Sequence, residues 1–173
     1  MSAQRIVILG NAAGGKSTLA RHLAQRHGLK HVEIDALYWQ PDWSPTPQDT
    51  YDRHHDAAIA KDSWIIDGGG DLASIKRRLT RATEVILLDF PLWIHYWRAA
   101  ERQIAWSTGA LEYPPAGGQD MPPTKRLFEI IWEVDRDWMP VLRELCDAYE
   151  RQGKDVSRIC DLDSLAALYA APA

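Results

Sequence analysis

The chain contains 173 residues, 46% of them hydrophobic, which is the size and composition of one globular unit with a single well-buried core. Its net charge of −4 weighs against a protein that binds mainly to the nucleic-acid backbone, since such proteins are usually basic. No apolar run approaches membrane-spanning length, and the start of the chain lacks a signal-peptide pattern. We therefore expect a single domain over residues 1–173, in the cytoplasm and without a membrane partner.

The first predicted elements are a strand and a helix joined by a glycine-rich loop. Residues 5–9 are short, β-branched and apolar, which predicts a buried parallel strand, and residues 18–27 place apolar side chains on one helical face. Residues 10–17 between them read Gly-Asn-Ala-Ala-Gly-Gly-Lys-Ser, the complete phosphate-loop pattern G-x-x-x-x-G-K-[ST]. In such a loop the backbone N–H groups and the helix N-terminus bind phosphate.

This loop predicts an ATP site. Lys16 is expected to bridge the β- and γ-phosphates, and the Ser17 hydroxyl is expected to ligate Mg²⁺. The predicted nucleotide contacts are Gly10, Asn11, Ala12, Ala13, Gly14, Gly15, Lys16, Ser17 and Thr18.

Apolar bursts alternate with amphipathic stretches along the rest of the chain. The further predicted strands are 31–35, 64–67, 84–89 and 156–160. The further predicted helices are 48–61, 72–81, 92–104, 125–150 with an interruption near Pro140, and 161–170. Proline-rich connections are expected at 40–47 and 108–124. Strands alternating with helices predict a three-layer α/β/α fold with a parallel sheet, and ligands at the carboxyl ends of its strands.

Three carboxylates directly follow predicted strands, at the edge where ligands are expected: Asp35, Asp67 and Asp89. A carboxylate there can hold Mg²⁺, usually through the water shell of the ion. The alternative is an aspartate that caps the next turn. For Asp67 we favour contact with metal or substrate, whereas for Asp89 both interpretations stay open.

Four segments together resemble the adenylate-kinase-related P-loop proteins, and most of all the branch labelled DNA topology modulation proteins. They are the phosphate loop, His-Val-Glu-Ile-Asp-Ala-Leu-Tyr-Trp at 31–39, Trp-Ile-Ile-Asp-Gly at 64–68 and Leu-Leu-Asp-Phe-Pro at 87–91. The resemblance implies a five-stranded parallel sheet of order 2-3-1-4-5. It also implies Mg·ATP as phosphoryl donor, an acceptor-binding segment at about 36–62 and a lid at about 103–126.

In these relatives two arginines lie one helical turn apart, seven and eleven residues after the proline that follows the fourth strand. Arg98 and Arg102 occupy those offsets from Pro91. The resemblance implies that Arg98 packs on the adenine and that Arg102 reaches the phosphates. The alternative is an ordinary solvated helix face.

The chain departs from these relatives in two places. Adenylate kinases follow Asp-Gly with a Pro-Arg whose arginine grips the AMP phosphate, whereas here Asp67 and Gly68 are followed by two more glycines. The nearest substitutes are Arg53, Arg77, Arg78 and Arg81, each of which is otherwise interpreted as a surface charge.

The second departure concerns the lid. Residues 103–124 contain no Lys or Arg, although phosphoryl transfer needs cations around the γ-phosphate. The nearest replacements are Lys125, Arg126 and Arg136.

The tryptophans are expected to fill the core and hinge contacts, except Trp39 and Trp43, which follow Asp35 and are placed to shape a pocket for a planar or apolar acceptor. The histidines show no metal-ligand set, and His22, His27, His54 and His55 are expected on helix surfaces. Cys146 and Cys160 are expected to be buried thiols rather than a disulfide.

The sequence thus predicts an ATP-dependent phosphotransferase similar to nucleoside monophosphate kinases, with a nucleotide or another small molecule as acceptor. The predicted catalytic residues are Lys16, Arg98, Arg102 and Asp67, and the predicted metal contacts are Ser17 and Asp67. The predicted acceptor contacts are Asp35, Trp39, Trp43, Asp67 and Gly68. The alternative is an ATP-binding regulatory protein with little phosphotransfer, and direct nucleic-acid binding ranks third.

Overall fold

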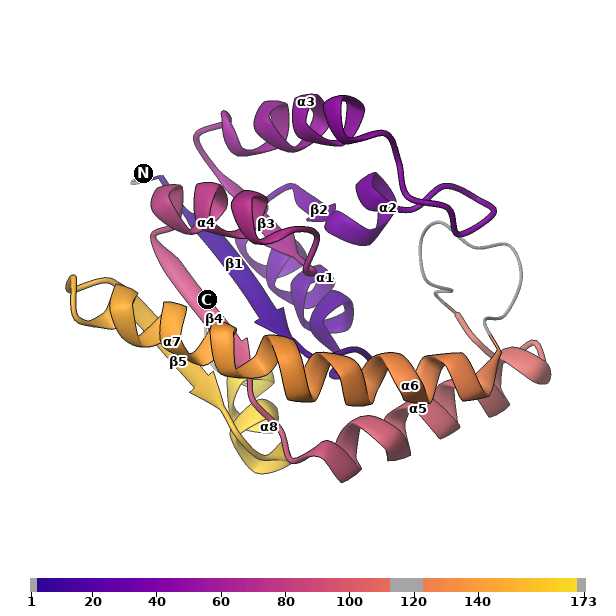
Figure 1. Ribbon diagram of the computed structural model, residues 1–173. Coiled ribbons are helices and arrows are strands. Elements are labelled where there is room, and N and C mark those ends of the chain that lie inside the picture. Colours follow the sequence, from indigo (N-terminus) through magenta and orange to yellow (C-terminus); the bar gives the residue numbers. More distant parts are fainter. Residues whose placement is uncertain (1–2, 113–122, 171–173) are drawn as a thin grey trace.

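The computed structural model describes residues 3–112 and 123–170. Five strands, all paired in parallel, form one sheet in the order β2-β3-β1-β4-β5 (Figure 1). The strands are β1 (Arg5–Gly10), β2 (His31–Glu33), β3 (Trp64–Asp67), β4 (Glu84–Leu88) and β5 (Asp155–Ile159). The predicted fold class and strand order are confirmed.

Helices cover both faces of this sheet, as the prediction of three layers requires (Figure 1). They are α1 (Lys16–His27), α2 (Ile34–Tyr38), α3 (Gln48–Ile59), α4 (Leu72–Arg81), α5 (Leu92–Ser107), α6 (Thr124–Glu133), the π-helical η1 (Val134–Trp138), α7 (Met139–Glu150) and α8 (Leu162–Ala170). Alternate residues of β1 enter different apolar cores, because successive side chains of a strand point to opposite faces. Val7 and Leu9 pack with α3, α4 and α7, whereas Ile6 and Ile8 pack with α1 and α8.

The second strand is shorter than predicted. It ends at Glu33, and the chain then turns into the short helix α2, so Asp35 lies in the first turn of a helix rather than at the end of a strand. This turn buries Ile34 completely against the core. An acidic residue in the first turn also suits the positive end of the helix dipole.

The interruption predicted near Pro140 is confirmed. The residues before the proline form η1, one wide π-helical turn that joins α6 to α7 in a continuous helical rod. The N–H of Met139 reaches back to the carbonyl of Val134, five residues earlier. A proline donates no hydrogen bond and crowds the preceding turn, and a π-helical segment accommodates both effects.

The prediction that tryptophans fill the core is wrong for three of them. Trp64 is fully buried, but Trp93 and Trp97 on α5 are 62% and 46% exposed, and Trp132 on α6 is 51% exposed. The buried face of α5 contains His95 instead of Trp93 and Trp97. Side-chain size and apolar character therefore do not explain which residues of α5 are buried.

Two other predictions about burial are also wrong. His55 is fully buried on α3 instead of lying on the surface, where it packs beside Tyr51 and contacts Asp56. Cys160 is exposed, whereas Cys146 is buried as predicted; neither forms a disulfide. In the described ranges 3–112 and 123–170, no helix is both long and apolar enough to cross a lipid bilayer.

We predict that Gly70→Ala destabilises the fold more than Gly28→Ala. Both glycines have similar positive φ angles, +75° and +65°, so the backbone strain of an alanine is comparable at the two positions. A Cβ at Gly70 would clash with the Tyr51 hydroxyl, whereas a Cβ at Gly28 meets open space. Urea unfolding should show a loss of about 1 kcal/mol for Gly28→Ala and about 2 kcal/mol more for Gly70→Ala. Equal losses would contradict this account of the turn.

Candidate functional site

The phosphate loop connects β1 to α1 in the predicted place. Three of its residues have positive φ, Gly10 at +144°, Ala13 at +56° and Gly15 at +90°, and α1 begins at Lys16 directly after the last of them. No side chain caps this end of α1. The first N–H groups of the helix and the loop amides are therefore suited to hold an anion.

Lys16 lies over its own loop. Its ammonium donates a hydrogen bond to the carbonyl oxygen of Asn11 at 2.8 Å. Lys16 is partly buried, and desolvation lowers its pKa, an effect that Asp35 and Asp67 oppose through their negative charges. The lysine thus belongs to a charged cluster, which we define as Lys16, Asp35, Asp67 and Arg102.

Ser17 and Asp67 are brought together as predicted. The Ser17 hydroxyl donates to Asp67 Oδ2 at 2.6 Å, although the two residues are far apart in the chain. Asp67 ends β3, which pairs with β1, and it is only 2% exposed. A hydroxyl and a carboxylate oxygen fit Mg²⁺, which prefers oxygen, takes few protein ligands and keeps much of its water. Among the described residues no group of three or more His, Cys, Asp or Glu side chains is placed to hold a metal ion.

His31 also contacts Asp67, which the sequence analysis missed. Its Nε2 lies 2.7 Å from Asp67 Oδ1, the oxygen that Ser17 leaves free, and the carboxylate can only accept, so Nε2 is the donor. The contact follows from the parallel pairing of β2 with β3. Predicting the contact between His31 and Asp67 requires the register of β2 against β3, and the sequence alone does not determine that register.

Asp35 and Arg102 complete the charged cluster. Asp35 is solvent-exposed as a whole residue. Partial desolvation of its carboxyl group raises the pKa of Asp35, Asp67 adds to the effect, and the positive charges of Lys16, Arg102 and Arg78 oppose it. Desolvation also lowers the pKa of Arg102, which Asp35 opposes. Arg102 is half-buried on α5.

Arg98 contacts the phosphate loop itself. Its Nη1 donates to the carbonyl of Gly14 at 2.8 Å, and its guanidinium carbon lies 5.6 Å from the centre of the Phe90 ring. One turn earlier on α5, His95 donates from Nδ1 to the carbonyl of Ala12 at 2.9 Å. His95 is a second residue that the sequence analysis missed, because no sequence motif marks a histidine that donates to a carbonyl of the phosphate loop.

Arg78 is not a surface charge. It is fully buried, and its Nη2 donates to the carbonyls of Gly68 and Gly69, the latter at 2.7 Å. Burial lowers its pKa to about 10. Arg78 therefore stabilises the glycine turn by bonding to its carbonyls. This turn is the segment in which adenylate kinases have Pro-Arg.

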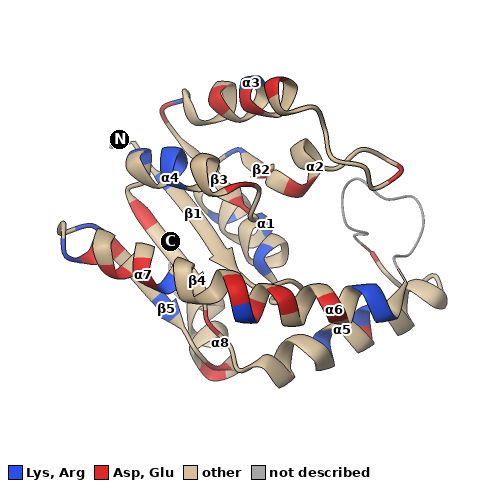
Figure 2. Cartoon of the chain, viewed as in Figure 1, with Lys and Arg blue, Asp and Glu red and all other residues tan. Residues whose placement is uncertain are grey.

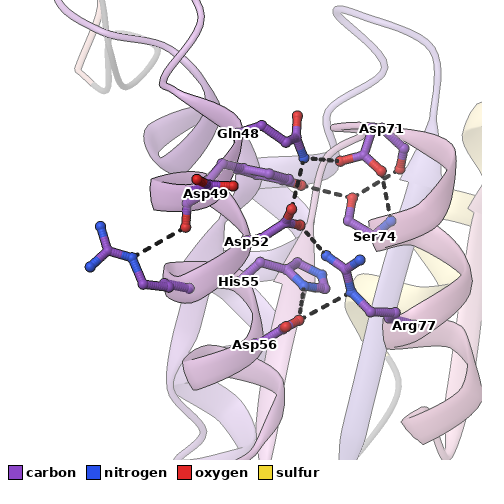
Figure 3. Close-up of polar contacts among 10 residues, drawn as sticks. Gln48, Asp49, Asp52, His55, Asp56, Asp71, Ser74 and Arg77 are labelled. Carbon is purple, nitrogen blue, oxygen red and sulfur yellow. Dashed lines mark hydrogen bonds and ion pairs between the residues drawn. The ribbon is translucent and has the colours of Figure 1, made fainter.

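Polar side chains tie the predicted acceptor segment to α4 (Figure 3). Arg77 on α4 pairs with both Asp52 and Asp56 on α3. The Tyr51 hydroxyl lies 2.8 Å from Ser74 Oγ, so the two helices are joined at a second level. Arg53, another predicted substitute, bonds within α3, and Arg81 donates to the Ala60 carbonyl.

Trp39 and Trp43 lie in the connection between α2 and α3. Their rings contact each other edge to face with centroids 6.4 Å apart, and Trp39 also meets the ring of Tyr38. Both side chains are partly buried. This arrangement stiffens the connection, and their role toward an acceptor stays a prediction.

The basic residues nearest the lid are engaged elsewhere. Lys125 is 90% exposed and pairs with Glu129, while Arg126 pairs with Glu133. Arg136 pairs with its neighbour Asp137. Figure 2 shows acidic and basic residues mixed along α6 and η1. Residues 113–122 of the predicted lid lie outside the described residues.

Asp89 has a structural partner. Its carboxylate accepts from both Nε and Nη2 of Arg143 on α7, the latter at 2.7 Å. This forked ion pair holds α7 at the end of β4. It favours the structural interpretation of Asp89 over contact with a metal.

The structure is an α/β fold with the phosphate-loop sequence pattern between β1 and α1. No family model matches the chain, and no curated protein matches it. Among solved structures, an unliganded sugar kinase from Janibacter sp. HTCC2649 matches 73% of this chain and 91% of its own at 19% identity, with a TM-score of 0.43. A gluconokinase from Sinorhizobium meliloti 1021 matches 87% of this chain and 97% of its own at 17% identity, with a TM-score of 0.46.

We predict that the free energy of unfolding falls as the pH is lowered through 6.5. Burial lowers the pKa of His55 and of His95 below the ordinary value of 6.5, so unfolding takes up protons in this range. The unfolded state then binds more protons than the folded state, and acid destabilises the fold. Urea unfolding between pH 7 and 5 should give a shallower loss for His55→Gln than for the unmodified protein. His54→Gln, which replaces the exposed neighbour, should leave the slope unchanged; equal slopes for both variants would contradict the prediction.

Proposed function

We propose that the chain is an ATP-dependent phosphotransferase that binds Mg·ATP at residues 10–18 and transfers the γ-phosphate to a small acceptor beside Asp35. The observation that carries this proposal is the hydrogen bond of 2.6 Å between Ser17 and Asp67. It joins the phosphate loop to the carboxylate at the end of the adjacent strand, in the same cluster as Lys16.

The donor side uses the loop and the first turn of α1. The amides from Gly14 to Thr18 hold the phosphates, and Lys16 leaves the Asn11 carbonyl to stabilise the transferring group. Ser17 and Asp67 would hold Mg²⁺, which supplies charge neutralisation on the phosphates when bound. Arg98 packs on the adenine through its guanidinium plane, and Arg102 faces the phosphates.

The acceptor side is built around Asp35. A carboxylate with a raised pKa is better matched to accept a proton from a hydroxyl at neutral pH. Gly68 lies beside it, since a Cβ on Gly68 would come 3.6 Å from Asp35 Oδ1. Trp39 and Trp43 form the wall of the acceptor pocket in this proposal.

AMP is not favoured as the acceptor. The arginine that grips its phosphate in adenylate kinases is missing, and Arg78, the buried arginine nearest the glycine turn, is fully enclosed and donates from Nη2 to the turn carbonyls. An acceptor recognised by its hydroxyl groups through Asp35 fits the described site better.

One observation favours the regulatory alternative. The cations Lys125, Arg126 and Arg136 point to acidic partners on their own helical rod rather than to the phosphate loop. A site with few cations around the γ-phosphate binds ATP but transfers phosphate slowly. A coupled assay with AMP, dAMP, CMP, UMP, GMP and small polyhydroxy acids such as gluconate separates the two functions. Rapid turnover on any of these excludes the regulator, whereas binding of Mg·ATP with no turnover favours it.

We predict that Lys16→Ala abolishes ATP turnover without unfolding the protein. The loss should reach about 10³-fold, because the ammonium acts on charge that develops on the transferring group. The matched control is Lys76→Ala, which removes an exposed lysine from α4 and should retain full turnover. Thermal melting should show both variants folded. Turnover retained by Lys16→Ala would contradict the proposed role of the loop.

A further inference from the structure

Side chains of α5 donate hydrogen bonds to two carbonyl groups of the phosphate loop. A loop that turns its N–H groups inward to bind an anion turns carbonyls outward, where they need other donors. His95 donates to the carbonyl of Ala12 at 2.9 Å, and Arg98 donates to that of Gly14 at 2.8 Å. The residue between them, Ala13, has φ +56°, a region that costs free energy for any residue other than glycine. The two bonds therefore flank the strained point of the loop.

His95 is placed with little freedom to move. Its side chain is fully buried, and a Cβ on Gly14 would come 3.1 Å from its Cε1 atom, so the ring lies directly against the loop. The Phe90 ring also contacts His95, and the centroids of the two rings are 6.0 Å apart. Ala12 and Ala13 pack with the apolar cluster formed by α5 and α6.

A carbonyl can only accept, so the Nδ1 atom that contacts the Ala12 carbonyl carries the proton. Nε2 makes no hydrogen bond of normal geometry with the described residues, although the backbone of Phe90 also interacts with the ring. A buried imidazole costs more free energy than an apolar side chain of similar size unless its polar atoms are paired. The bond to Ala12 pairs Nδ1, so filling space alone does not account for a histidine here.

From this geometry we infer that His95 is a positioning residue for nucleotide binding. Its Nδ1–H holds the Ala12 carbonyl outward, which keeps Ala13 in the left-handed region and turns the N–H groups of the loop toward the phosphates. His95 itself touches no nucleotide. The inference rests on the proposed binding of Mg·ATP to this loop, and it adds a role for α5 that does not involve the charged cluster.

Calorimetric titration with three probes tests this inference: Mg·ATP, inorganic tripolyphosphate and adenosine. His95→Leu fills the space without a donor and should bind Mg·ATP and tripolyphosphate about fivefold more weakly, the effect of one net hydrogen bond. His95→Asn places an amide N–H near the position of Nδ1 and should stay within about twofold of the unmodified protein. Binding of adenosine should not change, because the loop contacts phosphate only.

The matched control is His55→Leu, which removes an equally buried histidine from α3, away from the loop, and should leave all affinities unchanged. If the unmodified protein binds neither Mg·ATP nor tripolyphosphate, both the proposed function and the inference fail. If it binds them and His95→Leu binds equally well, or if His95→Asn loses as much as His95→Leu, the inference alone is overturned. Nitrogen-15 NMR of the unmodified protein tests the same point without any variant: a proton on Nε2 instead of Nδ1 would overturn it.

Discussion

The hydrogen bond between Ser17 and Asp67 depends on one constraint, the parallel pairing of β1 with β3. Ile8 of β1 lies opposite Asp67 in that register, so the end of β3 reaches the level at which β1 becomes the phosphate loop. The hydroxyl at the start of α1 then meets the carboxylate at 2.6 Å. A shift of one residue in register would turn the Asp67 side chain to the opposite face of the sheet and would separate the two groups.

Around this bond the charges of the cluster are partly withdrawn from water and only partly neutralised. Lys16 and Arg102 carry positive charge, and Asp35 carries the negative charge nearest the predicted acceptor. Arg78 adds a buried positive charge behind the glycine turn and donates to the carbonyls of Gly68 and Gly69. Such a balance favours a polyanionic ligand, because phosphates would compensate the cations that protein carboxylates leave only partly paired.

Helix α5 shows why apolar content is a poor guide to orientation in this protein. Its tryptophans at 93 and 97 predicted a buried aromatic face, yet the buried face contains His95, Ala99 and Gln103. The loop carbonyls of Ala12 and Gly14 need donors, and α5 supplies them from the same side. Leaving buried carbonyls without partners would cost more than leaving two rings partly in water.

The sequence by itself determined the phosphate loop, the bounds of most strands and helices, and the interruption before Pro140, because each depends on local backbone chemistry or on periodicity. From strand alternation and the resemblance it also predicted the parallel sheet and its order. Only the tertiary structure decided that Asp35 starts a helix, that His31 meets Asp67, that Arg78 is buried, and that His95 supports the loop. These features depend on register and on which face of a helix turns inward. Such choices are settled by partners distant in the chain, and no local pattern records them.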